Sequence, residues 1–253
     1  MDHLLRATAR AEARHFWFRG FRAFVTPLVR QALDGRRDPY ILDCGCGTGA
    51  NVDRLRRFGR TAGFDLSATG LRLARDAGRT RLVRASVAAA PFAGGRFDLV
   101  TSFDVLYAVD EREERAALSE MYRLLKSGGY ALITVAAMEM LRGDHSVLSR
   151  EIRRYDRDDL RNRVMQAGFT VERITYAYAS LFPQMALARA WQRARGLKQE
   201  DEQAAQHEIA VPPEPVNALL TGVLMLEAAW LRRFNAPFGS SLICLARKPV
   251  SQT

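Results

Sequence analysis

The chain has few cysteines, few lysines and no apolar run long enough to cross a bilayer. Its three cysteines cannot all pair, and Cys44 and Cys46 stand one residue apart, so no disulfide framework is expected. The longest apolar stretch, 218–231, is shorter than the roughly 20 residues of a spanning helix and contains Glu227. Arginines interrupt the N-terminal segment, which argues against a secretory signal. These absences favour a reducing, cytoplasmic setting.

Positive charge is abundant but dispersed. The formal net charge is +10, and only three of the 38 basic residues are lysines. The arginines extend from Arg6 to Arg247 instead of gathering in one block. Phosphates attract such a chain, but the dispersion does not favour nucleic acid, and anionic small molecules or a lipid surface suit the charge equally well.

Short apolar runs alternate with longer amphipathic ones, which predicts an α/β fold with a mostly parallel, doubly wound sheet. Helices are expected at about 50–58, 68–77, 111–126 and 157–167, the third beginning at an Asp110 cap and ending at Gly128 and Gly129. The expected strands are Tyr40–Asp43, Thr61–Asp65, Arg81–Ala85, Phe97–Ser102, Tyr130–Ala136, Val171–Ala177 and Ser241–Ala246.

Three regions follow from this pattern. Residues 1–38 are interpreted as an N-terminal helical cap, and 39–179 with 240–253 as a Rossmann-like core. Residues 180–239 form a helical insertion, with helices at about 184–195 and 215–234. Within it, Leu219, Val223, Leu226, Trp230 and Phe234 recur at helical spacing, which favours packing on the sheet over lining an apolar pocket.

A glycine-rich turn, Ile41 to Ala50, is the densest chemical signal. Apolar residues lead into Asp43, and glycines then recur at 45, 47 and 49 before a helix, so a ligand can approach the main chain closely. Gly45, Gly47 and Ala50 also satisfy the G-x-G-x-x-A dinucleotide pattern, with Asp65 as its ribose acid. Asp43 disfavours a pyrophosphate there and favours a cationic ligand.

This turn resembles motif I of class I S-adenosylmethionine-dependent methyltransferases, D-x-G-x-G-x-G. The likeness continues through Gly63-Phe64-Asp65-Leu66-Ser67, Ala90-Pro91-Phe92, Phe97-Asp98-Leu99-Val100, Phe103-Asp104-Val105-Leu106 and Leu124-Leu125-Lys126-Ser127-Gly128-Gly129. The flanks look like a small-molecule, type 11-like subgroup. The resemblance implies a seven-stranded sheet with an antiparallel last strand, and S-adenosylmethionine as methyl donor, leaving as S-adenosylhomocysteine.

Carried over by position, the resemblance implies the cofactor contacts. Gly45, Gly47 and Gly49 would lie against the cofactor, Asp43 beside its amino-acid part, and Asp65 at both ribose hydroxyls. Ser86 stands where the family has an acid for adenine, and the main chain at Ser102 and Phe103 would face the methionine moiety. Trp17 and Arg22 lie on a helix that precedes the core. Trp17 would contact the sulfonium or the adenine, and Arg22 the methionine carboxylate. The alternative is that this helix only packs on the core through its aromatic residues. Cys46, Leu66 and Val87 complete the expected set.

The acceptor side departs from the family pattern. Tyr107-Ala108 replaces a common Glu-His, so the usual base is absent, which methyl transfer tolerates because it mainly needs a positioned, desolvated nucleophile. Tyr107, His145 and Tyr155 are therefore the candidate catalytic groups. Cys44 and Cys46 lack zinc spacing, so no metal is expected.

The favoured hypothesis is a methyltransferase acting on a small-molecule acceptor, with the insertion as its lid. An RNA methyltransferase, an NAD-dependent oxidoreductase and a non-catalytic cofactor-binding protein are the alternatives. The sequence lacks the N/D-P-P-Y/F tetrapeptide of amino-methylating nucleic-acid enzymes, which weakens the RNA hypothesis. A monomer, a homodimer and a peripheral membrane contact by the insertion all stay open.

Overall fold

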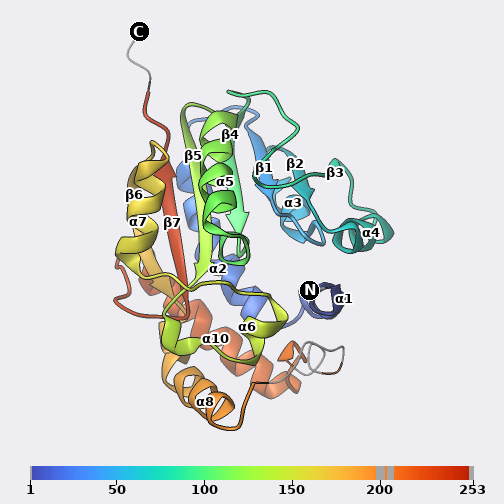
Figure 1. Ribbon diagram of the computed structural model, residues 1–253, viewed down its shortest axis with the longest axis vertical. Helices are drawn as coiled ribbons and strands as arrows, with labels where there is room; N and C mark the ends of the chain where they lie inside the picture. Colours follow the sequence, from blue (N-terminus) through green and yellow to red (C-terminus); the bar gives the residue numbers. More distant parts are fainter. Residues whose placement is uncertain (1, 198–202, 204–207, 251–253) are drawn as a thin grey trace.

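The computed structural model describes residues 2–197, 203 and 208–250. It contains one seven-stranded sheet of order β3-β2-β1-β4-β5-β7-β6 (Figure 1). The strands are β1 Tyr40–Cys44, β2 Arg60–Asp65, β3 Leu82–Arg84, β4 Phe97–Phe103, β5 Leu125–Ala136, β6 Thr170–Ala177 and β7 Ser241–Arg247. Strand β7 runs antiparallel to both β5 and β6, whereas the pairs among β1–β5 are parallel. The predicted Rossmann-like sheet with an antiparallel last strand is confirmed.

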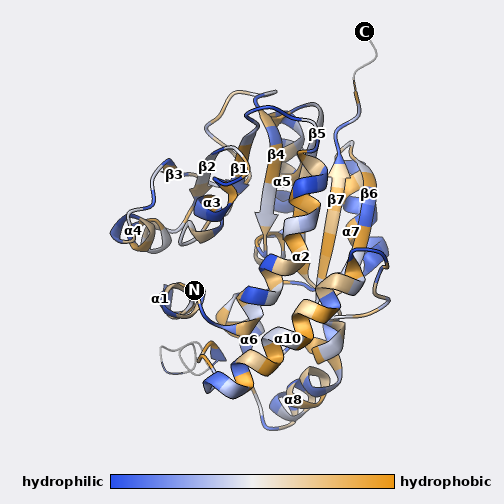
Figure 2. Ribbon diagram, turned by 180° about the vertical axis from the view of Figure 1, so that it is seen from behind, coloured by the Kyte–Doolittle hydropathy of each residue, from blue (hydrophilic) through white to orange (hydrophobic). Residues whose placement is uncertain are grey.

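Helices cover both faces of this sheet. Helices α5 (Glu111–Leu124) and α7 (Arg157–Gln166) lie on one face, and α2 (Phe16–Ala32) lies on the other, with α10 (Glu214–Leu231) packed beside it (Figures 1 and 2). The remaining helices are α1 Asp2–Ala11, α3 Ala50–Leu55, α4 Ala68–Asp76, α6 Asp144–Leu148 and α8 Phe182–Ala194, with 3₁₀ turns η1 Leu106–Ala108, η2 Glu139–Leu141 and η3 Ala179–Leu181. None of the described helices is long and apolar enough to cross a membrane.

The central strands are apolar because both of their faces are covered. Ile41, Leu42, Leu99, Leu132 and Ile133 are fully buried. The chain reverses its direction across the sheet between β1 and β4, which are neighbours. Ligands of open α/β sheets bind at the carboxyl ends of such strands, and α1 and α6 lie at that edge in Figure 1.

The third core helix ends earlier than the glycines predict. Helix α5 ends at Leu124, and Leu125 is already extended, buried and paired with Phe97 of β4. The pairing then shifts, because the next partners are Leu99 and Tyr130, and Gly128 adopts a left-handed φ of 72° within this irregularity. The glycines therefore form a bulge at the start of β5 and do not cap the helix.

The expectation that the apolar stripe of α10 packs on the sheet is wrong for most of its members. Leu219, Leu226, Trp230 and Phe234 are exposed, and only Val223 is partly buried. Helix α10 instead packs through the face that carries Leu224, Ala228 and Leu231, which sits beside α2. The buried face is thus turned about the helix axis from the predicted one.

Candidate functional site

The turn after β1 exposes main chain that side chains would otherwise cover. Gly45, Gly47 and Gly49 all have left-handed φ angles, of 76°, 52° and 75°, a region costly for other residues. A Cβ on Gly45 would lie 2.4 Å from Val105 Cγ2, whereas one on Gly47 would meet only Leu5, at 3.5 Å. The amides of Gly45 and Cys46 donate to the Phe64 carbonyl, which holds the turn against β2. The turn can therefore admit a ligand against its backbone.

Asp43 places a carboxylate at the floor of this turn with one oxygen unsatisfied. The Thr101 hydroxyl donates to Asp43 Oδ1 at 2.6 Å, but the buried Oδ2 has no hydrogen-bond partner in the described part of the chain. Burial, with a further contribution from Asp65, raises the pKa of Asp43 to about 7 despite the Thr101 bond. Ser102 Oγ, one residue along the neighbouring strand, is likewise buried and unpartnered there. Such orphaned atoms indicate a polar ligand.

Asp65 lies across from them at the end of β2. Its Oδ2 accepts from the Gly47 amide and its Oδ1 from the Ser67 amide, both at 2.7 Å. A carboxylate has about four acceptor positions, so both oxygens can still accept from ribose hydroxyls. Leu66, beside it, is 63% exposed, and Ser86 and the partly buried Val87 follow the neighbouring strand β3. The Ser86 hydroxyl accepts from the Ala88 amide.

These residues fit S-adenosylmethionine. The unpaired Asp43 carboxylate suits a cationic amino-acid end, the glycines leave room for the nucleoside, and Asp65 suits its ribose. When bound, this cofactor supplies a methyl group on a sulfonium that an aligned nucleophile displaces. Asp43, Asp65 and the glycine turn are the residues that would hold and orient it.

A glutamate that the sequence analysis missed fastens α1 to the glycine turn. Glu12 is buried and accepts from the Thr48 hydroxyl and from Arg79, both at 2.8 Å. Arg22 donates to the carbonyls of Glu12 and Ala13, at 2.9 and 3.4 Å. No local signal marks Glu12, because its partners lie 36 and 67 residues away.

Trp17 lies in an aromatic stack at the start of α2. Its ring is parallel to that of Tyr178 at a centroid distance of 3.7 Å, and the Tyr178 hydroxyl donates to the Trp17 carbonyl. Nearby, Phe21 meets Phe103 edge to face. One face of the Trp17 ring is thus used by the protein, and α2 reaches the residues at the end of β4.

The candidate groups Tyr107 and His145 both lie near one buried ion pair, formed by Glu151 and Arg154. Arg154 donates to Glu151 at 2.8 Å and to the Ala137 carbonyl at 2.7 Å. Burial, with the acidic neighbours Asp104 and Glu151, raises the pKa of Tyr107 well above its ordinary value. Burial lowers the pKa of His145 despite Glu151. A neutral histidine can accept a proton at neutral pH, whereas such a tyrosine keeps its proton and can take part only through hydrogen bonds.

Tyr155 faces a different cluster. Its hydroxyl lies 3.0 Å from Glu114 Oε1 and 3.1 Å from the Leu106 carbonyl, and Glu114 also accepts from Arg153 and Arg163. Burial, together with Glu114, raises the pKa of Tyr155. The structure therefore does not bring Tyr155 together with Tyr107 and His145 around the Glu151–Arg154 pair.

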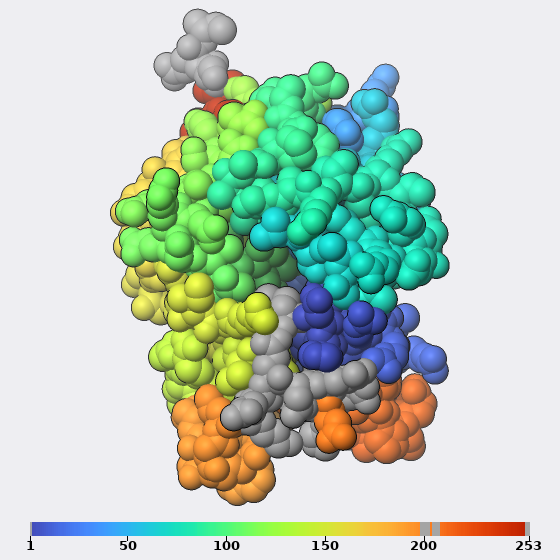
Figure 3. All heavy atoms as spheres, turned by 45° about the vertical axis from the view of Figure 1, so that its right-hand side comes forward, coloured from blue at the N-terminus to red at the C-terminus, as the bar shows by residue number. Residues whose placement is uncertain are grey.

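Asp104, which the sequence marks only as part of a motif, is a further candidate. It follows β4 with a left-handed φ of 58° and accepts from the Thr134 hydroxyl at 3.2 Å. The residue is exposed to solvent, so a bound acceptor can reach its carboxylate. Six described non-glycine residues have a positive φ, and the place of Asp104 at the carboxyl end of β4 makes it the candidate among them. Figure 3 shows a hollow between the core and the dark-blue α1 at this edge.

The sheet order, the glycine turn and the strand-end carboxylates define a cofactor-binding α/β fold with its site at the switch point. Residues 42–133 match the family described as "Methyltransferase domain". The chain carries a class I S-adenosylmethionine-dependent methyltransferase domain.

Individual relatives agree on the domain and differ in what they act on. The chain is 35% identical over 115 residues to "Malonyl-[acyl-carrier protein] O-methyltransferase" of Enterobacter lignolyticus, covering 43% of each chain. It is 31% identical over 150 residues to "Probable tRNA methyltransferase 9B" of Bos taurus, covering 55% of this chain and 32% of that one. A solved S-adenosylmethionine-dependent methyltransferase from Thermotoga maritima shares the fold, with a TM-score of 0.57, 18% identity, and coverage of 98% of this chain and 100% of the other.

The matched part is limited in length. The chain spans about a third to a half of the curated relatives described here, and 48% of an uncharacterized protein of Methanocaldococcus jannaschii.

Proposed function

We propose that the protein transfers a methyl group from S-adenosylmethionine to a small-molecule acceptor by in-line displacement. The observation that carries the proposal is the buried, unpaired Asp43 Oδ2 beside three left-handed glycines. A half-satisfied carboxylate in a buried site calls for a cationic or hydrogen-bonding partner. The ammonium of S-adenosylmethionine supplies one, with the sulfonium as a second nearby positive charge.

The same carboxylate argues against NAD. A pyrophosphate in this turn would bring negative charge towards Asp43 and Asp65, and Coulomb repulsion in a desolvated site is strong. The family match to residues 42–133 supports the methyl donor independently.

Covering of the carboxyl edge supports a small acceptor. Helix α1 is fastened to the glycine turn by Glu12, and α1 packs on α4. The partly buried His145, the buried Tyr107 and the exposed Asp104 lie on the proposed acceptor side. In this proposal His145 or Asp104 takes the proton that the nucleophile loses, and Tyr107 donates a hydrogen bond that orients the acceptor. The 180–239 insertion is the proposed lid.

Calorimetric titration of the purified chain with S-adenosylmethionine and, separately, with NAD tests the cofactor. We expect binding of the first only, and at least tenfold weaker binding in Asp43→Asn, because the amide cannot pair with a cation. Binding of NAD alone would refute the proposal.

Transfer of radiolabel from methyl-labelled S-adenosylmethionine to a panel of metabolites tests catalysis. We expect a labelled small product, with a lower rate in His145→Ala. Labelling of RNA instead would replace the proposed acceptor class, and cofactor binding with no transfer to any acceptor would support a non-catalytic binding protein.

A further inference from the structure

Helix α10 presents an uncharged outer face to solvent. Between Glu214 and Arg232, the one charged residue is Glu227, and its buried carboxylate accepts from the amides of Ala179 and Ser180. The exposed positions of α10 include Leu219 at 68%, Leu226 at 74% and Trp230 at 46%. Figure 2 views this side and shows α10 orange along most of its length. An exposed apolar surface this continuous marks an interaction site.

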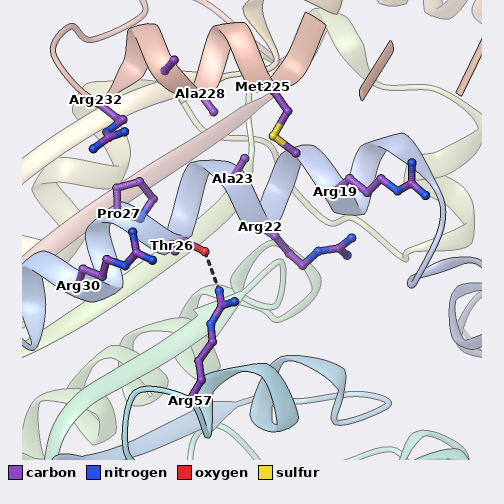
Figure 4. Close-up of a pocket in the computed structure, with 11 residues that line it drawn as sticks. Arg19, Arg22, Ala23, Thr26, Pro27, Arg30, Arg57, Met225, Ala228 and Arg232 are labelled. Atoms are coloured by element: carbon purple, nitrogen blue, oxygen red, sulfur yellow. Dashed lines mark hydrogen bonds between the residues drawn. The ribbon is translucent and has the colours of Figure 1, made fainter. Parts of the chain in front are cut away.

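An arginine groove borders this face. It has a volume of about 410 Å³ and lies between α2 and α10, with Arg57 reaching in beside α2 (Figure 4). Its floor and upper wall are apolar and include Met225 and Ala229 of the exposed α10 face. Its cationic lining consists of Arg19, Arg22, Arg30, Arg57 and Arg232.

The charge of this groove is largely uncompensated. No acidic side chain is among the described residues that line it, and the carboxylate of Glu214 comes within 4.0 Å of Arg19 only. Arg57 donates to the Thr26 hydroxyl and Arg22 to main-chain carbonyls, which are neutral acceptors. Burial, and then the neighbouring cations Arg54 and Arg19, lower the pKa of Arg22 to about 10, although the carboxylate of Glu12 opposes this shift. The groove therefore carries a positive potential that an anion would relieve.

We propose that the face formed by α2 and α10 docks on an anionic lipid bilayer. The arginine groove binds lipid phosphates, and the outer face of α10 enters the headgroup region with Trp230 at the interface. An apolar helix face bordered by arginines is the combination that interfacial helices use, and tryptophan is enriched at that depth. The inference does not depend on methyl transfer.

Charge and shape favour a bilayer over two other occupants. RNA would pair with the arginines, but the aliphatic side chains Leu219, Leu226 and Met225 would gain nothing from its backbone. A second copy stacked on the same face would bring two arginine grooves together, and their like charges repel. An anionic bilayer satisfies both the arginines and the apolar face.

Co-sedimentation with vesicles tests the proposal on the full chain. Vesicles of pure phosphatidylcholine are compared with vesicles containing 30% phosphatidylglycerol, at low and high salt. We expect binding to the anionic vesicles only, weakened by salt. Each basic residue near such a surface contributes about a fivefold change in affinity, so Arg30→Ala with Arg232→Ala should weaken binding by about 25-fold.

The apolar contribution has its own variant and matched controls. Leu226→Ser with Trp230→Ser should weaken vesicle binding at least tenfold with only a small fall in melting temperature, because both side chains are exposed and the one ring contact given up among the residues that the structure describes is the stack of Trp230 on Phe234. Met165→Ser on α7 and Arg112→Ala with Arg115→Ala on α5 change exposed residues on the opposite face, and should leave binding unaltered.

Three results would overturn the proposal. The first is that the wild-type protein does not bind anionic vesicles. The second is that the arginine variant and the Leu226→Ser with Trp230→Ser variant bind them as well as the controls do. The third is that a single-stranded RNA binds the protein while vesicles do not, and that Arg30→Ala with Arg232→Ala weakens this RNA binding. That result would assign the groove to nucleic acid.

Discussion

Asp43 is a buried carboxylate with a hydrogen-bond partner for Oδ1 and none for Oδ2 among the described residues. Its pKa is raised to about 7 in the folded chain, from an ordinary value of 3.8. At a pH between these two pKa values, Asp43 keeps its proton in the folded protein and has lost it in the unfolded chain. This group therefore lowers the free energy of unfolding of the ligand-free protein as pH rises from about 4 to about 7.

Cofactor binding should show the opposite pH dependence. A cationic ligand prefers ionised Asp43, so affinity for S-adenosylmethionine should rise by up to about tenfold per pH unit below pH 7 and then level off. Titration calorimetry at pH 5.5, 6.25 and 7 checks this. Asp43→Asn has no proton to lose at this position and should show a nearly flat profile; a wild-type profile that is equally flat would contradict the assignment.

Asp65 should contribute to affinity through the ribose. Asp65→Ala should weaken S-adenosylmethionine binding by at least about 1 kcal/mol, from lost hydrogen bonds to a charged acceptor. The substitution also removes the acceptor of the Gly47 and Ser67 amides, so the turn itself loosens. Competition by adenosine and 2′,3′-dideoxyadenosine separates the two effects. Wild-type protein should prefer adenosine and Asp65→Ala should not; a preference retained in the variant would place the ribose elsewhere.

The sequence predicts the place of a single site residue where that residue lies in or next to a motif. Asp43 and Asp65 lie at the ends of consecutive strands, as alternation predicts, and the roles that the resemblance implies for them stay predictions. Glu12 and Asp104 could not be found in this way. The partners of Glu12 are remote in sequence, and the left-handed backbone of Asp104 is fixed by β4, β5 and Thr134 and not by its own neighbours.

At the scale of elements, Gly20 permits the close approach of α2 to α10. A Cβ at Gly20 would lie 2.4 Å from Leu224 Cδ1 and 3.0 Å from Leu224 Cβ, and Leu224 is fully buried. Alanine in a helix interior normally stabilises relative to glycine by up to about 1 kcal/mol. Overpacking costs about 1 to 3 kcal/mol, so Gly20→Ala should lower the free energy of unfolding.

Gly222 provides the matched control on α10. A Cβ there would meet nothing within 4 Å, so Gly222→Ala should raise the free energy of unfolding by about 0.5 to 1 kcal/mol. Urea unfolding of both variants checks the pair. Stabilisation by both substitutions would mean that Leu224 moves aside without cost.

The elements themselves followed from periodicity, and their boundaries and orientations did not. All seven strands and the core helices lie where alternation predicts them. The end of α5 was misplaced because the pairing of Leu125 with Phe97 overrides a local glycine signal. The face of α10 was misjudged because nearly all of its residues are apolar, so periodicity cannot decide which side is buried; packing against α2 decides it.

At the scale of the whole molecule, a bound cofactor joins parts that are distant in sequence. The glycine turn, β2, β4 and the N-terminal helices all border one site, so a ligand that binds only the folded chain stabilises all of them together. At a concentration 100 times its dissociation constant, such a ligand adds about 2.7 kcal/mol to the free energy of unfolding. For a chain of this size that is a rise in melting temperature on the order of 5 to 10 °C.

Thermal unfolding with saturating S-adenosylhomocysteine, which has no methyl to transfer, measures this rise apart from turnover. The rise should be absent with NAD at the same concentration. It should be smaller in Asp65→Ala and unchanged in Met165→Ser, which lies on α7 away from the site. An equal rise in Asp65→Ala would show that the ligand stabilises the fold from another place, because a ribose held by Asp65 links β2 to the glycine turn and cannot do so without that carboxylate.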